Sequence, residues 1–427
     1  MKADLTSVAR AILENLLDQF EQPGRQRVAR ARLDEKEHPD YFSAIDGTPR
    51  RETNAALCQF ADQNLVRLHW RKWEEQNWLE SVDLVPENAN TIYKLLGRIA
   101  RNTRETELRE RLAAQTPRAG WHADFLQGMT QQLDAHRSVA PLDLATPREN
   151  HDLIRALAAL ADLSAPTLER KLSTQLFGDS KRLKDLLRPM LAVLRRHDPS
   201  AADYGDDDGA LLRAHQLERV PEYVPLAGPL VLQTGQSQLD VTPFAPSVAI
   251  SAATIRSARV AACSARAILT IENATSFSEF ASVRPATALA IFTGGFASPA
   301  IVTLLKEIRA LNPALFFFHW GDLDVGGLRI LAHLKSQLGT VAALAMDPDT
   351  FDQYRVHAQK LNAKEREAFR QLQAHPLLGD CAAVIQHLLA ADRKLEQEAV
   401  EVKRVMRLLE HSLDGNQSLG FDTDRSP

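Results

Sequence analysis

The stretch LFFFHWGDLDVGGLRI, residues 315–330, decides the fold of this 427-residue chain. Its first four residues are apolar and uncharged, which predicts a strand that is buried on both faces of a parallel sheet. Asp322 and Asp324 follow the strand, and the glycine pair after them lets the chain turn into a helix that begins near Leu328. We therefore expect both acids at the carboxyl end of a strand, where open α/β sheets bind ligands.

This acidic pair has two interpretations. In extended backbone, the side chains of Asp322 and Asp324 leave the same face, roughly 6.6 Å apart along the strand. Two carboxylates placed in this way repel each other and raise one pKa unless a divalent cation neutralises them. Mg²⁺ suits the arrangement, because it binds one or two carboxylates and fills its other positions with water and phosphate oxygens. The alternative is a loop-forming pair that caps the following helix.

The composition is that of an ordinary soluble protein. The length suggests two or three domains, and 44% apolar with 25% charged residues is typical of globular chains. The net charge of -4 means that a nucleic-acid surface must be a local patch. The longest apolar stretches, such as 341–346, are far shorter than the roughly 20 residues of a membrane span, and no signal-peptide pattern is present. Three widely spaced cysteines indicate neither a disulfide framework nor a zinc site. We expect no membrane association and a cytoplasmic location.

Residues 1–86 show the pattern of a winged-helix module. Three expected helices precede two strand-like runs that are joined by the polar segment RKWEEQN; these segments are helices 4–20, 25–33 and 51–64 and strands 65–70 and 78–85. Three helices followed by a β-hairpin is the order of a winged helix-turn-helix. The module is therefore a candidate DNA-binding domain.

Arginines cluster on the second and third of these expected helices. They are Arg25, Arg27, Arg30, Arg32, Arg50 and Arg51. We expect Arg25, Arg27, Arg50 and Arg51 to contact DNA phosphates. The alternative is that the module packs or dimerises without binding DNA, and Glu74 and Glu75 in the presumed wing favour that alternative slightly.

The middle of the chain is strongly helical. We expect residues 87–200 to form a helical arm or dimerisation region. The basic helix within 177–197 includes Lys181 and Arg182, which are candidate DNA contacts, although a solvated helix face is the alternative. Residues 201–246 are expected to be a connection that contains a loop over 198–210 and a β-hairpin over 229–244. This hairpin is a candidate wing of a second winged helix built on the preceding helices.

From residue 247 to 427 strands alternate with helices. The repeated units are 267–277, 288–308, 315–327 and 340–348. Alternation with short connections predicts a parallel sheet with right-handed crossovers. Glu272 follows the first strand directly, Gly294 and Gly295 follow the second, and the Asp322–Asp324 pair follows the third. The three acids should therefore meet at one edge of the sheet and bind Mg²⁺ there.

These residues carry a family resemblance. Glu272, Gly295 and the Asp-Leu-Asp motif at 322–324 resemble the Toprim domain of topoisomerases, bacterial primases and related nucleases, and the DxD followed by a small residue and glycine is most similar to the A subunit of type IIB topoisomerases. More specifically, TIENATSF, LFGDSKRL, the Gly228-Pro229 strand start and the later LEQEAV resemble the JetD family, the nuclease subunits of Wadjet plasmid-defence systems. The likeness extends over 172–406.

The resemblance implies a function. The protein is expected to be an α+β multidomain chain with a winged-helix module, a helical middle and a carboxyl-terminal α/β Toprim domain with a parallel sheet. Its expected activity is that of a homodimeric, Mg²⁺- or Mn²⁺-dependent DNA endonuclease that makes double-strand breaks in plasmid DNA. The JetD resemblance adds an SMC-type ATPase and kleisin complex as the expected partner.

Within that expectation the acids have separate roles. Asp322 and Asp324 would hold one ion against the scissile phosphate, while Glu272 would share that ion or a second one and orient or deprotonate the attacking water. Glu396 and Glu398 lie two residues apart, a spacing at which helical side chains do not share a face. One of them could reach the site, but the expected arrangement is an exposed helix.

Three alternatives remain distinct. A type IIB topoisomerase would cleave through a tyrosine on a winged helix, and of the five tyrosines only Tyr41 lies in a winged-helix candidate, in an expected loop after Pro39. The JetD resemblance implies hydrolysis by a metal-activated water instead. A DNA-binding adaptor with an inactive Toprim-like domain is the second alternative. The third, a nucleotide-binding domain, is disfavoured because neither GxGxxG nor GxxxxGK[ST] follows any expected strand.

Overall fold

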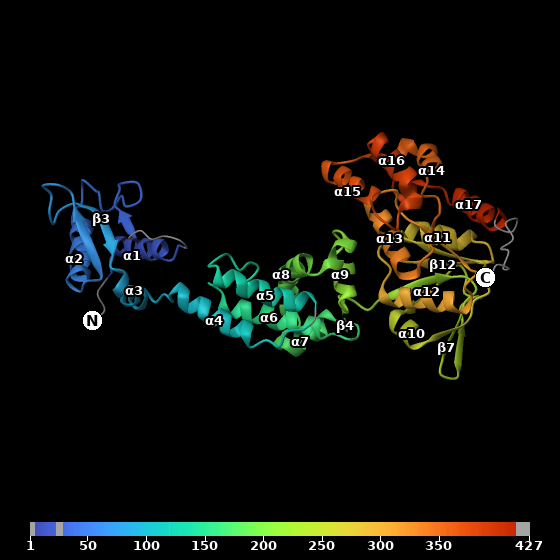
Figure 1. Cartoon of the computed structure of the whole chain (residues 1–427), viewed down its shortest axis with the longest axis horizontal. Helices are drawn as coiled ribbons and strands as arrows, with labels where there is room; N and C mark the ends of the chain where they lie inside the picture. The colour runs from blue at the N-terminus through green and yellow to red at the C-terminus, as the bar shows by residue number, and fades with distance from the viewer. Residues whose placement is uncertain (1–4, 23–28, 119, 416–427) are drawn as a thin grey trace, which may run out of the picture. The chain divides into compact units, whose positions relative to one another are not determined.

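A computed structural model describes residues 5–22, 29–118 and 120–415 (Figure 1). The chain divides into two compact units, Met1–Ala158 and Ala159–Pro427, which are described separately below. Among the described residues, no helix combines the length and the apolar character that crossing a membrane requires.

The first part of unit 1 is a small α/β module. Its elements are α1 (Ser7–Phe20), β1 (Arg30–Arg32), α2 (Thr48–Asp62), β2 (Val66–Trp70) and β3 (Leu79–Leu84). The three strands form an antiparallel sheet in the order β1-β3-β2. The expected helix at 25–33 is wrong for Arg30–Arg32, because this segment pairs with β3 as an edge strand. Arg25 and Arg27 lie outside the described residues. The hairpin β2–β3 was predicted correctly.

The module has its own hydrophobic core, built from the faces that α1 and α2 turn toward the sheet. Ile12 and Leu16 of α1, Leu57 of α2 and Val82 of β3 are fully buried within it. Between β1 and α2 the described chain forms turns where a winged helix has its second helix. The described residues therefore contain two helices before the hairpin, where three were expected.

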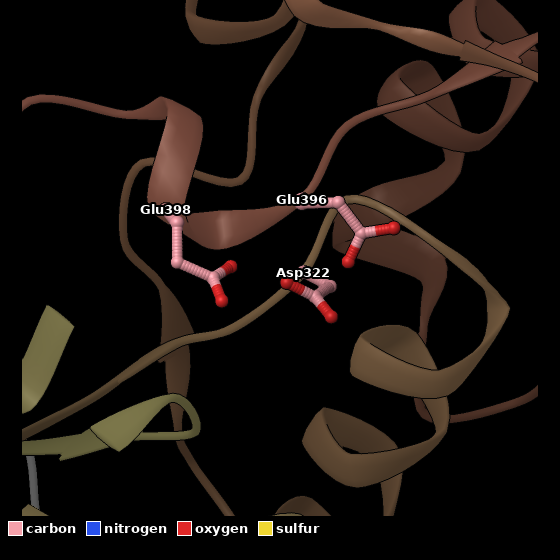
Figure 2. A group of neighbouring side chains, drawn as sticks. All are labelled: Asp322, Glu396 and Glu398. Carbon is pink, nitrogen blue, oxygen red and sulfur yellow. The ribbon is translucent and has the colours of Figure 1, made fainter. Parts of the chain in front are cut away.

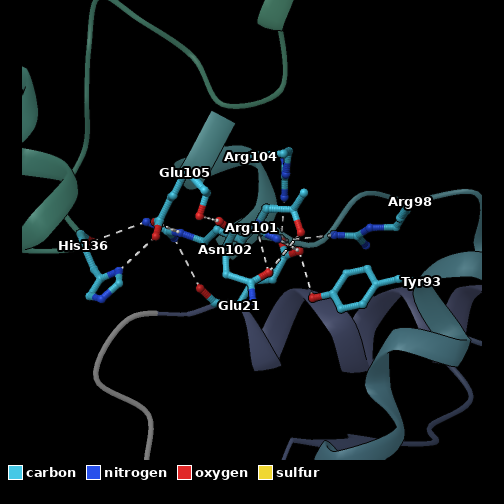
Figure 3. Close-up of polar contacts among 10 residues, drawn as sticks. Glu21, Tyr93, Arg98, Arg101, Asn102, Arg104, Glu105 and His136 are labelled. Atoms are coloured by element: carbon cyan, nitrogen blue, oxygen red, sulfur yellow. Dashed lines mark hydrogen bonds and ion pairs between the residues drawn. The ribbon is translucent and has the colours of Figure 1, made fainter. Parts of the chain in front are cut away.

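Helices make up the rest of unit 1. They are η1 (Pro86–Asn88), α3 (Ala89–Leu96), α4 (Arg101–Ala113), α5 (Trp121–Asp134) and α6 (Pro147–Ala161). Figure 3 shows that the carboxylate of Glu21, just after α1, contacts several residues at the start of this helical region. It accepts hydrogen bonds from Tyr93 Oη (2.9 Å), Arg104 Nη2 (2.9 Å) and the Arg101 N–H (3.1 Å). These arginines are therefore committed to a structural contact.

Unit 2 begins with helices and two short strands. They are β4 (Thr167–Leu168), α7 (Glu169–Phe177), α8 (Arg182–His197), η2 (Pro199–Tyr204), α9 (Asp208–Ala214) and β5 (Leu217–Glu218). The loop expected over 198–210 is wrong, because η2 and the start of α9 occupy most of it. Asp198 favours this structure, since its side chain accepts a hydrogen bond from the Ser200 N–H (2.9 Å) at the start of η2.

A six-stranded sheet dominates unit 2. Its strands are β6 (Tyr223–Ala227), β9 (Val248–Ser251), β11 (Ala267–Ile271), β12 (Ala288–Phe292), β13 (Phe316–Trp320) and β14 (Ala342–Ala343), in the order β14-β13-β11-β12-β6-β9. The four strands β11 to β14 are parallel, as predicted, whereas β6 and β9 add an antiparallel edge. Because β6 belongs to this sheet, residues 201–246 are more than the expected connection.

The crossover helices cover both faces of this sheet. They are α11 (Ala274–Val283), α12 (Pro299–Leu311) and α13 (Val325–Leu338). Right-handed crossovers from β11 to β12 and back to β13 place α11 on one face and α12 with α13 on the other. The helices α11 and α12 therefore leave the carboxyl ends of neighbouring strands toward opposite faces, the topology at which open α/β sheets bind ligands.

The predicted hairpin at 229–244 exists as β7 (Val231–Thr234) and β8 (Ser237–Asp240). It pairs with β10 (Arg259–Ala262), which follows α10 (Ala252–Ser257), in a separate three-stranded sheet. Its buried residues belong to the same core as the main sheet. The hairpin is therefore part of this domain and not a wing on the preceding helices.

The segment after β14 folds back toward the sheet edge. Its elements are α14 (Pro348–Gln353), η3 (Arg355–His357), β15 (Gln359–Lys360), α15 (Ala363–Gln373), η4 (Gly379–Cys381), α16 (Ala382–Ala391), β16 (Arg393–Lys394), η5 (Gln397–Ala399) and α17 (Val402–Gly415). An isolated antiparallel bridge joins Leu395 to Leu323. This bridge brings the residues around η5 beside the Asp-Leu-Asp motif.

Candidate metal-binding site

Parallel pairing of β11 and β13 brings the first two predicted acids together. Ile271 and Trp320, the last residues of these strands, are partners in the register. The Glu272 N–H continues the ladder to the Trp320 carbonyl (3.2 Å), and Glu272 Oε2 accepts a hydrogen bond from the Asp322 N–H (3.3 Å). Glu272 and Asp322 therefore meet at the carboxyl edge of the sheet, as the strand pattern predicted.

Gly321 makes this approach possible. A Cβ atom at this position would lie 2.7 Å from Glu272 Oε2 and 2.7 Å from His319 Nε2, which is closer than atoms pack. His319 is fully buried, and its Nδ1 pairs with Thr270 Oγ1 at 3.0 Å. The glutamate therefore occupies space that any larger residue at position 321 would fill.

Asp324 has a local structural role. Its Oδ1 accepts a hydrogen bond from the Gly327 N–H (2.8 Å), which caps α13. The helix-cap interpretation is therefore correct for this residue. Its Oδ2 faces Lys394 Nζ at 3.9 Å, so one oxygen of the carboxylate remains outside the cap. Capping and ion binding are thus compatible.

Two further glutamates reach Asp322 from the segment around η5. One carboxylate oxygen from each of Asp322, Glu396 and Glu398 lies within 4.8 Å of the other two (Figure 2). Figure 2 shows the three carboxylates turned toward a common space, with Glu396 and Glu398 on one segment and Asp322 on the other. Glu272 and Asp324 flank this compact group. The predicted trio thus only partly matches the cluster in the structure.

The expected exposed helix at Glu396 and Glu398 is wrong. Glu396 has extended backbone (φ -73°, ψ 146°), and a single 3₁₀ turn follows it. Glu396 thus precedes the 3₁₀ turn and Glu398 lies within it, so the two side chains do not follow α-helical spacing, and one carboxylate oxygen of each lies within 4.8 Å of the other.

Gln397 holds the two segments in place. Its side chain is 1% exposed and bonds to both strand ends: Oε1 accepts from the Asn273 N–H (2.8 Å), and Nε2 donates to the Trp320 carbonyl (2.9 Å). Its backbone N–H donates to Asp322 Oδ1 at 2.6 Å. One buried amide thus connects β11, β13 and η5 and orients the carboxylates on either side of it.

The negative charge in this cluster is poorly neutralised. Burial, followed by the nearby Asp322 carboxylate, raises the pKa of Glu272 to about 8. Burial also raises the pKa of Asp322 to about 7, and the neighbouring Asp324, Glu396 and Glu398 contribute to this rise. Proximity of several carboxylates in a half-buried site favours a bound cation or bound protons.

Lys394 is the cation that contacts this cluster among the described residues. Its Nζ lies 3.2 Å from Glu365, 3.6 Å from Glu396 and 3.9 Å from Asp324. One ammonium group among so many carboxylates leaves a net negative charge. Carboxylate oxygens are the ligands that Mg²⁺ and Mn²⁺ favour. The donor set therefore fits a hard divalent cation.

Three of the five tyrosines of the chain are buried. Tyr41 is fully buried, and its hydroxyl donates to Asn54 Oδ1 (2.9 Å) and accepts from the Leu79 N–H (2.8 Å). Tyr93 and Tyr354 are also buried. Tyr41, the one tyrosine that the sequence places in a winged-helix candidate, thus has a structural role.

The predicted DNA contacts are spread over both units. Arg50 and Arg51 lie in the first turn of α2, half-buried and exposed respectively. Lys181 is exposed at the N-cap of α8, and Arg182 is half-buried as its first residue. Their role in DNA binding stays a prediction.

Comparison with known proteins finds one family similar to this chain. Residues 230–409, which include all five acids of the cluster, match the family model described as "Wadjet protein JetD, C-terminal". The chain is also similar to the Wadjet protein JetD of Bacillus cereus (strain Q1), with 23% identity over 367 residues that cover 84% of this chain and 88% of the relative.

Proposed function

Because the chain is a JetD-like protein of the Wadjet type, we propose that it is a DNA endonuclease that uses Mg²⁺ or Mn²⁺ at the acidic cluster. The observation that carries this proposal is the convergence of Asp322, Glu396 and Glu398, with Glu272 beside them at the same sheet edge. Side chains from three distant parts of the sequence meet there, and together they present more negative charge than the protein neutralises.

The residues divide the work. Asp322, Glu396 and Glu398 would hold the cation, with Asp324 or Glu272 available for a second ion. A divalent cation in such a site supplies Lewis-acid polarisation of the phosphodiester and stabilises charge on the oxygens around phosphorus. Glu272, whose Oε2 accepts a hydrogen bond from the Asp322 N–H, would take the proton of the attacking water in its ionised form, which a neighbouring cation would favour by lowering its raised pKa. Asp322 stays oriented by the Gln397 N–H during the reaction.

The proposal extends to the biological setting. Since the matched family and the relative carry the name Wadjet, we infer that the protein is the nuclease component of such a defence system. Plasmid DNA is then the substrate, and an SMC-type ATPase and kleisin complex is the partner. Cutting both strands of a duplex needs two sites, so the proposal includes a homodimer.

The test combines metal binding with DNA cleavage. Purified full-length protein is titrated with Mn²⁺ by calorimetry and incubated with supercoiled plasmid, with and without the partner complex. We expect Asp322→Asn and Glu396→Gln each to weaken Mn²⁺ binding and to abolish linearisation. Glu401→Gln, an exposed glutamate nearby, is the matched control and should behave as wild type.

Two outcomes would count against the proposal. Unchanged Mn²⁺ affinity in Asp322→Asn would remove the acidic cluster as the metal site. Normal metal binding without cleavage of any DNA, even with the partner complex, would favour the non-catalytic adaptor instead.

A further inference from the structure

A stack of aromatic rings lies on the amino-terminal module, between the turn before α2 and the start of β3. The rings of Phe42 and Trp78 are stacked, with centroids 5.3 Å apart and planes inclined by 14°. Tyr41 packs edge-on against both rings, and its buried hydroxyl bonds fix it to Asn54 and Leu79. The stack is therefore anchored in the core of the module.

Two arginines rest on this stack. The guanidinium carbon of Arg50, in the first turn of α2, lies 3.7 Å from the ring centroid of Trp78. That of Arg71, just after β2, lies 5.1 Å from the Phe42 centroid and 5.6 Å from the Trp78 centroid. All three distances are within the range of cation–π attraction. One aromatic platform thus holds two positive charges from separate elements.

A third arginine lies beside them. Arg51 Nη2 donates to Thr48 Oγ1 (3.0 Å), and a Cβ atom at Gly47 would lie 3.2 Å from Arg51 Nη1 and 3.4 Å from Arg50 Nη2. The two guanidinium groups therefore fold over the same residue at the start of α2. The loop between β2 and β3 also contacts this helix, because Asn54 Nδ2 donates to the carbonyls of Gln76 (3.2 Å) and Asn77 (2.9 Å).

Several other arginines of unit 1 are paired with carboxylates: Arg30 with Asp83, Arg98 with Asp18, Arg101 with Glu105, and Arg104 with Glu21. Arg50, Arg51 and Arg71 have no carboxylate within ion-pair distance among the described residues. A guanidinium that is stacked on a ring leaves its N–H edge free to bind a phosphate.

We propose that Arg50 and Arg71, held by the Phe42–Trp78 stack, and Arg51 beside them form a grip for the phosphate backbone of duplex DNA. The grip rests on the proposed function, which makes DNA the substrate, and adds Arg71 and the aromatic platform that orients the arginines. Because the platform restrains the guanidinium groups before binding, less side-chain entropy is lost when a phosphate arrives. The arginines would contact phosphates and not base edges, so binding should not depend on the DNA sequence.

The loop between β2 and β3 also carries negative charge. Glu74 Oε2 accepts a hydrogen bond from Asn77 Nδ2 (3.0 Å), so its carboxylate is held within the loop. Glu75 is exposed and would repel a phosphate. Removal of this charge by Glu75→Gln should therefore strengthen DNA binding, which is the opposite of the effect expected at the arginines.

The test measures binding without cleavage. Full-length protein carrying Asp322→Asn is titrated in EDTA against a fluorescent 30-base-pair duplex at several salt concentrations. Arg50→Ala with Arg71→Ala should weaken binding at least about tenfold and lower the slope of log K against log salt by about 1.8, since each lost phosphate contact contributes about 0.9. Trp78→Leu keeps both charges but removes the platform, so its affinity should also fall.

Arg10→Ala is the matched control, because Arg10 already pairs with Glu14 (3.6 Å) and should contribute little. The grip is wrong if the double variant, folded by circular dichroism, keeps the affinity and salt slope of its parent, or if the parent does not bind the duplex. The binding assay contains no metal and needs no cleavage. Its result therefore does not depend on whether the protein proves to be a nuclease. Conversely, if Asp322→Asn loses cleavage but binds DNA normally, the acidic cluster is needed for cleavage and not for DNA binding.

Discussion

The backbone N–H of Gln397 donates a hydrogen bond to Oδ1 of Asp322 at 2.6 Å, across 75 residues of sequence. The contact joins the 3₁₀ turn η5 to the loop after β13, and the Gln397 side chain extends it to the end of β11. The acidic cluster is therefore closed by a segment that lies outside the sheet. Its geometry depends on this one buried residue as well as on the strands.

Replacement of Gln397 by alanine should disturb both stability and metal binding. The change leaves the Asn273 N–H and the Trp320 carbonyl without their partners, which costs roughly 1–3 kcal/mol in the free energy of unfolding. It also frees η5 to move, so Mn²⁺ affinity should fall. Urea unfolding and calorimetry measure the two effects. A variant within about 0.5 kcal/mol of wild type, with unchanged affinity, would show that the residue does not organise the site.

Gly321→Ala should lower the cleavage activity of the protein. The new methyl group would lie 2.7 Å from Glu272 Oε2, so the glutamate has to move away from the Asp322 N–H. We expect cleavage to fall at least about tenfold, because a small misplacement of a catalytic group has effects of that size or larger. Gly379→Ala is the control, since a Cβ there meets no atom within 4 Å. Full activity in Gly321→Ala would mean that the position of Glu272 is unimportant.

The main sheet was predictable where its strands are apolar throughout. The cores of β11, β12 and β13 contain Ala, Ile, Leu and Phe and end at glycine or acidic residues, so length and flanking residues identify them. The sequence did not reveal β6, because Pro225 interrupts a run of five residues. Nor did it reveal β1, whose three residues Arg-Ala-Arg look helical or exposed and become a strand only through pairing with β3.

The acidic cluster was predictable only where it depends on the sheet. Glu272 and Asp322 follow neighbouring strands, so parallel topology alone brings them together. Glu396 and Glu398 arrive through the Leu323–Leu395 bridge and the buried Gln397, which are contacts between residues far apart in sequence. No local pattern marks such contacts. The LEQEAV segment carries part of the family resemblance, but its place beside Asp322 depends on these long-range contacts.

Without metal, the stability of the protein should fall as pH rises, and bound metal should counter this dependence. The folded pKa values of Glu272, about 8, and Asp322, about 7, lie above the ordinary values of 4.5 and 3.8. The folded state therefore holds more protons than the unfolded state between about pH 4 and 8, and the contribution of these groups to stability falls as pH rises through that window. In EDTA, thermal unfolding should shift to lower temperature between pH 6 and 9.

Bound Mn²⁺ should reverse this trend, because it replaces the protons as the neutralising charge. Mn²⁺ binding at pH 7 should release protons, which calorimetry detects as a dependence of the heat on the ionisation enthalpy of the buffer. Asp322→Asn should show a smaller pH effect. Identical pH profiles with and without metal in the wild type would contradict the assignment of the cluster.

Lys394→Met should increase metal affinity while it lowers activity. The ammonium group lies 3.6 Å from Glu396 and 3.9 Å from Asp324, so it competes with a cation for the same carboxylates. Its removal should tighten Mn²⁺ binding by about tenfold, a modest share of the Coulomb energy of charges at this distance. Cleavage should fall because a positive charge next to the site is lost. Lys360→Met, on the neighbouring strand β15 and exposed, is the control; weaker metal binding in Lys394→Met would contradict this account.

Hydrolysis and tyrosine transesterification make opposite predictions at two tyrosines. Tyr223 is 63% exposed at the start of β6, which pairs with β12 in the main sheet, whereas Tyr41 is buried and hydrogen-bonded on both sides. If water is the nucleophile, Tyr223→Phe should cleave plasmid at the wild-type rate. Tyr41→Phe should unfold at lower urea concentration, since it leaves the Leu79 N–H without its partner at a cost of about 1–3 kcal/mol, but it should keep its activity per folded molecule. Denaturant trapping during the reaction, followed by gel analysis of labelled DNA, should yield no covalent protein–DNA adduct for the wild type or for either variant. An adduct that disappears in one of the two variants would identify that tyrosine as the nucleophile and replace hydrolysis by transesterification at the same acidic cluster.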